Sequence, residues 1–184
     1  IESYITNPID YKNKDYIFSK DFPYWLIYRN NFFDSIVDKM ELNIFESFRD
    51  RQITKKHTLN SGDIRVLKSR NIASNSIKDI DKYDCFIDEI DSFVVSKYLN
   101  QNNIVLIPNL TYNPRATFLP NNTITDGSVA LLKPKDNISI TSSHLEYYSS
   151  SEFTEYYKIA RNRGTRSLNI DNNSVQFFGL LKKA

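Results

Sequence analysis

The sequence predicts a mixed α+β domain, with a twisted, largely antiparallel sheet flanked by helices. Apolar residues recur at helical spacing from Phe32 to Met40, and two Ser-x-x-Glu patterns between residues 143 and 152 match helix starts. Short apolar runs, such as residues 104–107, are separated by polar turns and are typical of strands.

Length and composition limit the kind of protein. The 184 residues fit one domain, which we place at residues 23–184, after a polar N-terminal linker or loose segment at residues 1–22 that follows an upstream catalytic domain. Hydrophobic residues make up 40% and charged residues 25%, without a long apolar run, so we expect a cytoplasmic, globular chain with no membrane segment. The chain begins at Ile1 without a signal-peptide pattern, and we expect it to be part of a longer protein.

The first helix follows an aromatic run. Residues 24–27 predict a buried strand or helix entry, with Trp25 in the core, and Tyr28 is expected to pack inside as well. Asn30 or Asn31 is the expected N-cap of the helix that carries Phe32 to Met40.

The remaining elements follow in order after a turn at residues 60–63. We expect strands at residues 64–67, 104–107, 116–119 and 128–132, with a further one at residues 138–141. Helices are expected at residues 93–99 and 151–160, the second one stopping at Gly164. An apolar strand or turn at residues 175–181 completes the chain.

The most prominent charge feature is a basic segment at residues 48–71. It contains seven basic residues against two acidic ones, a balance of +5, whereas the whole chain carries only +2. A surface segment that concentrates positive charge in this way is typical of proteins that bind a polyanion. Charge alone fits a solvated surface hairpin equally well.

A second basic cluster, at residues 158–166, surrounds the end of the C-terminal helix. The basic segment and this cluster could flank a cleft, with residues 109–115 as a third, polar loop. Arginine pairs well with guanine, and asparagine or glutamine with adenine. The candidate base-contacting residues are therefore Arg51, Gln52, Asn71 and Arg115. The candidate contacts to the nucleic-acid backbone are Arg49, Lys55, Lys56, His57, Lys68, Arg70, Tyr112, Asn113, Arg161, Arg163 and Arg166.

Catalytic constellations are missing from the sequence. His57 and His144 lie far apart, without a nucleophile motif, and we expect His144 to be structural. With only four glycines, a phosphate-binding glycine-rich loop is not expected. The single cysteine, Cys85, predicts a small buried side chain rather than a disulfide or metal ligand. We therefore predict no catalytic residue, metal site or cofactor in this chain.

An acidic segment at residues 78–91 leaves two alternatives open. Its balance is −4, but its spacing matches neither a calcium loop nor a nuclease carboxylate set, so a solvated face is favoured. A metal-dependent nuclease that uses these carboxylates is one alternative function. The other is an interaction module whose basic segment binds an acidic protein partner.

Several blocks of the sequence together resemble a known family. They are RNNFFDSIVDKMELNIFESFRDRQITKKHT, GDIRVLKSRNI, VLIPNLTYNPRATFLP, DGSVALLKP and SSEFTEYYKIARNRGTRSLNID. They are similar to the C-terminal target-recognition domain of type II and type IIS restriction–modification adenine-specific DNA methyltransferases. The second and last blocks also resemble the recognition domains of type I specificity subunits.

The resemblance implies a recognition domain that binds double-stranded DNA opposite a methyltransferase domain of the same parent chain. In the parent, S-adenosylmethionine would methylate adenine N6 in a flipped nucleotide. Asn113-Pro114-Arg115 invites comparison with the family's Asn-Pro-Pro-Tyr motif, but its second proline and aromatic residue are absent here. The methyl-donor motif has no counterpart either, so the methylation chemistry is expected to lie outside this chain.

Overall fold

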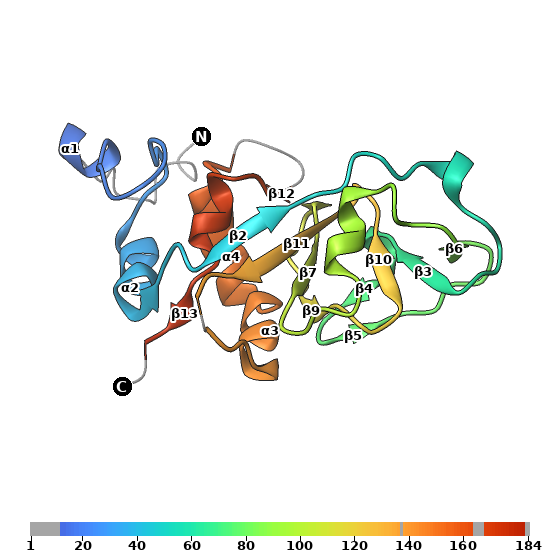
Figure 1. The fold of residues 1–184 in the computed structure, drawn as a ribbon. Coiled ribbons are helices and arrows are strands. Elements are labelled where there is room, and N and C mark those ends of the chain that lie inside the picture. Colours follow the sequence, from blue (N-terminus) through green and yellow to red (C-terminus); the bar gives the residue numbers. More distant parts are fainter. Residues whose placement is uncertain (1–11, 137, 164–167, 183–184) are drawn as a thin grey trace, which may run out of the picture.

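The computed structural model describes residues 12–136, 138–163 and 168–182, and it confirms a mixed α+β fold (Figure 1). The α-helices are α1 (Lys14–Ile17), α2 (Asn31–Lys39), α3 (Ser142–Tyr148) and α4 (Ser151–Ala160). Short 3-10 helices are η2 (Lys55–His57), η3 (Ser69–Asn71), η4 (Val94–Tyr98) and η5 (Ser174–Phe177). The strands are β1 (Met40–Glu41), β2 (Phe45–Phe48), β3 (Ile64–Leu67), β4 (Ile72–Ala73), β5 (Ser76–Ile77), β6 (Cys85–Ile87), β7 (Val105–Pro108), β8 (Leu110–Thr111), β9 (Thr117–Phe118), β10 (Thr123–Thr125), β11 (Val129–Pro134), β12 (Leu168–Asn169) and β13 (Leu180–Leu181).

A four-stranded antiparallel sheet, in the order β2-β11-β7-β9, forms the centre of the molecule. Because successive residues of a strand point to opposite faces, β11 contributes to two different cores. Val129 and Leu131 belong to one buried cluster, and Ala130 and Leu132 belong to the other. The near-continuous apolar run of this strand is therefore explained by burial on both of its faces.

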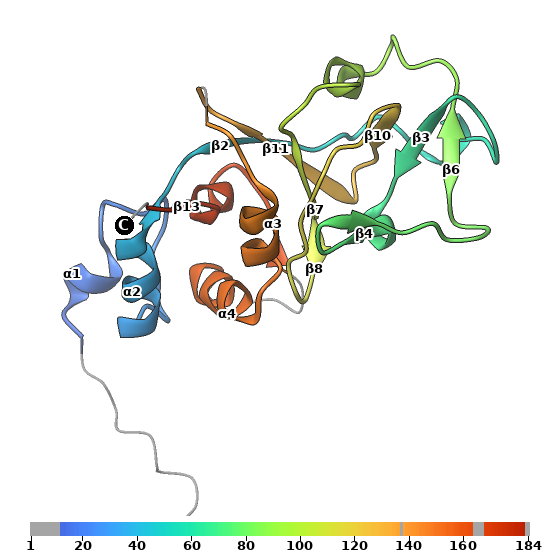
Figure 2. The ribbon, with the colours of Figure 1, turned by 90° about the horizontal axis from the view of Figure 1, so that it is seen from below.

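The two faces of the central sheet carry different layers. Helices α2, α3 and α4 cover one face and form the helical core, which includes Phe33, Leu145 and Phe153. On the other face lies the strand core, which includes Val66 and Ile124 from a small sheet in the order β10-β3-β6 (Figure 2).

The sheet is less unified than the sequence indicates. Instead of one sheet there are several, and β10 pairs with β3 in parallel. The strands are only two to six residues long, and polar turns between them redirect the chain before a wide sheet can form.

Local sequence signals place the two main helices correctly. The Asn30 side chain accepts a hydrogen bond from Phe33 N at 3.0 Å, which confirms the predicted N-cap of α2. Helix α4 is capped by Ser150 rather than by Ser149, whose hydroxyl donates to Leu145 O at the end of α3. The two helices pack through Phe33 and Tyr156, whose rings stack with centroids 5.0 Å apart.

The aromatic run before α2 corrects one prediction. Leu26 is buried, but Trp25 is 61% exposed and Tyr28 is 50% exposed, so the expectation that they lie in the core is wrong. The segment is a turn whose backbone is held by Asn162, which accepts from Ile27 N and donates to Trp25 O. In a strand, alternate side chains of this run would have pointed into the core, whereas the turn leaves Trp25 and Tyr28 exposed.

Residues 138–141 form no strand, contrary to the prediction. Their backbone is instead hydrogen-bonded by one side chain: Asn103 accepts from Ile140 N at 2.9 Å and donates to Ile138 O at 2.7 Å. The amide of Asn103 therefore replaces a neighbouring strand, and Ile140 still reaches the helical core.

The predicted boundary at residue 22 falls within packed structure. Phe22 contacts Phe33 and Phe177, with ring centroids 5.5 and 5.9 Å apart, so this end of the N-terminal segment packs against the helical core. Gly164 and Arg166 lie outside the described residues. No helix in the described ranges is long and apolar enough to cross a bilayer.

Candidate nucleic-acid interface

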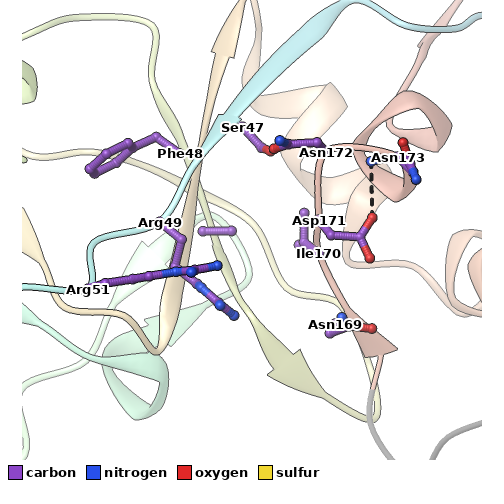
Figure 3. Close-up of a pocket in the computed structure, with 10 residues that line it drawn as sticks. Ser47, Phe48, Arg49, Arg51, Asn169, Ile170, Asp171, Asn172 and Asn173 are labelled. Atoms are coloured by element: carbon purple, nitrogen blue, oxygen red, sulfur yellow. Dashed lines mark hydrogen bonds between the residues drawn. The ribbon is translucent and has the colours of Figure 1, made fainter.

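A cleft of about 670 Å³ lies between the end of β2 and the segment that follows β12 (Figure 3). It brings together two of the candidate residues, Arg49 and Arg51, with a group of side chains from the C-terminal part of the chain. Its lining consists of Ser47, Phe48, Arg49, Arg51, Ala130, Asn169, Ile170, Asp171, Asn172 and Asn173.

The turn after β2 presents the arginine side of the cleft. Asp50 is 1% exposed, and its carboxylate accepts hydrogen bonds from Gln52 N at 3.0 Å and Ile53 N at 2.7 Å. An added Cβ at Gly127 would lie 2.6 Å from Asp50 O, so this position needs glycine for the turn to rest against the start of β11. With Asp50 fixed inside, Arg51 and Gln52 lie at the surface.

The opposite side is the asparagine loop, which we define as residues 169–173. Asp171 accepts hydrogen bonds from Asn173 N at 3.0 Å and Ser174 N at 2.8 Å. The Ser47 hydroxyl lies 3.1 Å from Asn172 Oδ1 and donates to it, which links the two sides of the cleft. The loop therefore has a defined backbone and exposed amide side chains at Asn172 and Asn173.

A half-buried arginine lies behind the asparagine loop. Arg161 donates to Asn169 Oδ1 at 2.5 Å and lies 3.3 Å from an oxygen of Asp171. Burial alone would raise the pKa of Asp171, but the hydrogen bond from Ser174 N and the charge of Arg161 outweigh it and hold that pKa below its usual value. The candidate Arg161 is therefore engaged inside the protein rather than exposed for a backbone phosphate.

Ion pairing distinguishes the two arginines of the cleft from four others, although Arg70 and Arg115 also lack a carboxylate partner among the described residues. Within the described ranges, neither Arg49 nor Arg51 has an ion-pair or hydrogen-bond partner for its guanidinium. Figure 3 shows both side chains extending from the β2 side of the cleft. Among the described residues, the arginines with carboxylate partners are Arg29, Arg65, Arg161 and Arg163, the last of which pairs with Glu155.

The lysines of the basic segment lie apart from the cleft. Lys55 and Lys56 are exposed on η2, where His57 accepts from Thr54 N through Nδ1 and contacts Phe93. Lys55 lines a second, smaller cavity of about 330 Å³ together with Lys68. There the Lys68 ammonium donates to Tyr83 O and lies 4.0 Å from the centre of the Tyr83 ring, which Arg70 also approaches.

Asn71 is not at the surface. It is 0% exposed, donates to Asp84 Oδ1 at 2.6 Å and to Lys78 O at 3.0 Å, and accepts from Lys68 N. Asp84 also pairs with Arg65 at 2.7 Å. Both the Oδ1 and the Nδ2 of Asn71 are therefore hydrogen-bonded inside the fold. Asn71 cannot contact a base in this conformation, and we exclude it from the interface.

The loop of residues 109–115 contributes exposed groups beside the asparagine loop. Strand β8 pairs with β12, so Tyr112, which is 66% exposed, and Asn113 follow a strand that lies next to Asn169. Arg115 is only partly exposed, and its Nε is buried without a hydrogen-bond partner in the described part of the chain. Gln52 has its side-chain oxygen occupied by Val94 N at 2.8 Å, which leaves its amide NH₂ for a ligand.

The carboxylates of the acidic segment are distributed over local contacts. Asp79 and Asp84 both pair with Arg65, and Asp88 accepts from Asp63 N. No group of three His, Cys, Asp or Glu side chains suited to a metal ion occurs in the described residues. His144 accepts from Thr141 N at the start of α3, and burial lowers its pKa.

The asparagine loop was not among the candidates from the sequence. Its run Asn169-Ile170-Asp171-Asn172-Asn173 has the composition of a turn, and this was the only local signal available. Its position opposite Arg49 and Arg51 depends on contacts between residues more than a hundred positions apart, such as Ser47 with Asn172.

Comparison with family models and with curated proteins found no relative of this chain. No protein-family model matches this sequence, and no match to a curated protein was found.

Proposed function

We propose that this chain is a DNA sequence-recognition domain, part of a restriction–modification methyltransferase that modifies adenine at N6. It binds duplex DNA through the cleft and positions the target site for a methyltransferase domain in another part of the parent chain. The blocks of residues that resemble target-recognition domains support the choice of this family.

One observation carries the proposal. Arg49 and Arg51 project into the cleft without a carboxylate partner in the described structure, although four other arginines of the chain are paired. An unpaired guanidinium in a polar cleft fits a phosphate or a guanine edge, both of which it can bind with two parallel hydrogen bonds. Lys55 and Lys56 lie apart from the cleft but are exposed on the same basic segment, where they could contact further phosphates.

The methylation chemistry belongs to the rest of the parent. The chain has no glycine-rich loop for S-adenosylmethionine and no complete Asn-Pro-Pro-Tyr motif, so we assign the cofactor and the flipped adenine to the methyltransferase domain.

The test is a titration of labelled mixed-sequence duplex with the 184-residue chain, followed by fluorescence anisotropy at several salt concentrations. Replacing Arg49 and Arg51 together with alanine should weaken binding to every duplex. The slope of log affinity against log salt should become shallower by about one to two units, because fewer phosphate counterions are released.

A matched variant controls for net charge. Lys14→Ala with Lys39→Ala also removes two positive charges, but from α1 and α2, which lie at the opposite end of the ribbon from β3, β6 and β10 (Figure 1), and neither lysine lines the cleft. This variant should bind with almost unchanged affinity and slope. Equal losses in both double variants would mean that the cleft is not the binding surface, and no binding by the unmodified chain at low salt would favour an acidic protein partner instead.

A further inference from the structure

The backbone of the asparagine loop is held by several side-chain hydrogen bonds. Besides the Asp171 hydrogen bonds to Asn173 N and Ser174 N, the Tyr157 hydroxyl donates to Asn169 O at 2.9 Å. Asn109 accepts from Ile170 N at 3.2 Å. Side chains from α4 and from the loop after β7 therefore fix the backbone from which Asn172 and Asn173 project.

The negative charge of the asparagine loop is offset by an ion pair. Asp171 is the acidic residue of the cleft lining, and its second oxygen faces Arg161. Since this ion pair offsets the negative charge, a DNA duplex can approach the loop while Arg49 and Arg51 attract it from the other side. Arg161 acts here as a positioning residue through Asn169 and Asp171.

The two exposed asparagines differ in what they can offer. Asn172 has its Oδ1 occupied by the Ser47 hydroxyl. Among the described residues, Asn173 has no partner for either its Oδ1 or its Nδ2. Adenine presents N7 as an acceptor and N6–H as a donor in the major groove, and an asparagine with both groups available can pair with the two at once.

We infer that the asparagine loop is the base-contacting side of the cleft and that Asn173 binds the major-groove edge of an adenine. Asn172, whose Nδ2 has no partner among the described residues while its Oδ1 already accepts from Ser47, donates to an acceptor on a neighbouring base. This inference rests on the proposed DNA-binding function and adds the residues and the base class that give it specificity.

Selection from a randomised duplex pool tests the inference, because it requires no assumption about the recognised site. The unmodified chain should enrich a consensus that contains adenine. Asn173→Ala should lose the preference at one adenine position, and Asn173→Asp should shift that position towards cytosine, whose N4 amino group donates to a carboxylate. A shifted preference requires a folded protein, so it separates specificity from misfolding.

A modified base then probes the contact directly. Replacing that adenine with 7-deazaadenine removes the N7 acceptor, and the unmodified chain should lose about 5- to 150-fold in affinity. Asn173→Ala should bind the two duplexes alike. Asn102→Ala, at an exposed asparagine that does not line the cleft, is the matched control and should keep the full consensus.

The outcomes separate the two proposals. An unchanged consensus in both Asn173 variants, or a pool bound without any consensus, would overturn the inference and leave DNA binding by the cleft intact. Failure of the unmodified chain to retain the pool at low salt would overturn the proposed function and this inference with it.

Discussion

At the scale of single residues, Asn71 shows how a polar side chain in a basic segment can serve the fold. Its amide connects Lys68 N, Lys78 O and the Asp84 carboxylate within a buried site. Asp84 itself is charged: burial raises its pKa, but the hydrogen bonds from Ile80 N and Asn71 and the nearby Arg65 bring it below the usual value. Asn71 is thus part of the charge balance around Arg65.

Asn71→Ala should therefore lower the free energy of unfolding by about 2–3 kcal/mol, because it leaves buried backbone groups and a carboxylate without their partner. Urea denaturation followed by circular dichroism measures the loss. Asn113→Ala is the matched control at an exposed position, where we expect a change within about 0.5 kcal/mol. Equal stability of the two variants would contradict the role that we give to Asn71.

The sequence could predict which residue types would matter but not which of them are free. Arg51 and Asn71 belong to the same basic segment and both have the chemistry to contact a base, yet one is exposed and the other fully buried. The difference arises from Asp84, which lies thirteen positions after Asn71 and reaches it only in the folded chain. Burial and pairing are tertiary properties, and local composition does not contain them.

At the scale of elements, the same distinction separates helices from loops. The N-cap and the apolar spacing of α2 are local signals, and they predicted Asn31–Lys39 well. The prediction of a strand at residues 138–141 was wrong because the backbone there is hydrogen-bonded by the Asn103 side chain rather than by another strand. The asparagine loop likewise depends on Arg161 and Asn109, which the sequence does not place beside it.

The asparagine loop also makes the free energy of unfolding depend on pH. The folded pKa of Asp171 is lower than its unfolded value, so the charged form favours the fold; its contribution is complete above about pH 4 and is lost as the pH falls through the folded pKa. Asp171→Asn should be less stable than the unmodified chain by about 1 kcal/mol or less at neutral pH, since the pair is partly exposed.

Thermal melts from neutral pH down to about pH 3 measure this dependence. The difference between Asp171→Asn and the unmodified chain should shrink as the solution is acidified below about pH 4. A difference that stays constant over the whole range would show that the Asp171 charge is not what stabilises the loop.

At the scale of the whole molecule, the central sheet joins two cores that would otherwise be separate. Leu131 and Leu132 are adjacent on β11, each 0% exposed, and they enter the strand core and the helical core respectively. The cleft lies where these two halves meet, between the end of β2 and the asparagine loop. Its geometry therefore depends on both cores being folded at once.

This arrangement predicts cooperative unfolding of the two layers. Leu131→Ala and Leu132→Ala should each lower the free energy of unfolding by about 2–5 kcal/mol, and each should destabilise both sides of the sheet, because the strand between them is shared. Hydrogen exchange in increasing urea, measured on peptides that cover β3 and α4, should then show both regions opening at one midpoint in each variant. Lys133→Ala, exposed on the same strand, is the control and should leave the midpoint almost unchanged. If Leu131→Ala loosened β3 while α4 kept its original midpoint, the halves would be independent units, and the cleft between them would no longer be fixed by the fold.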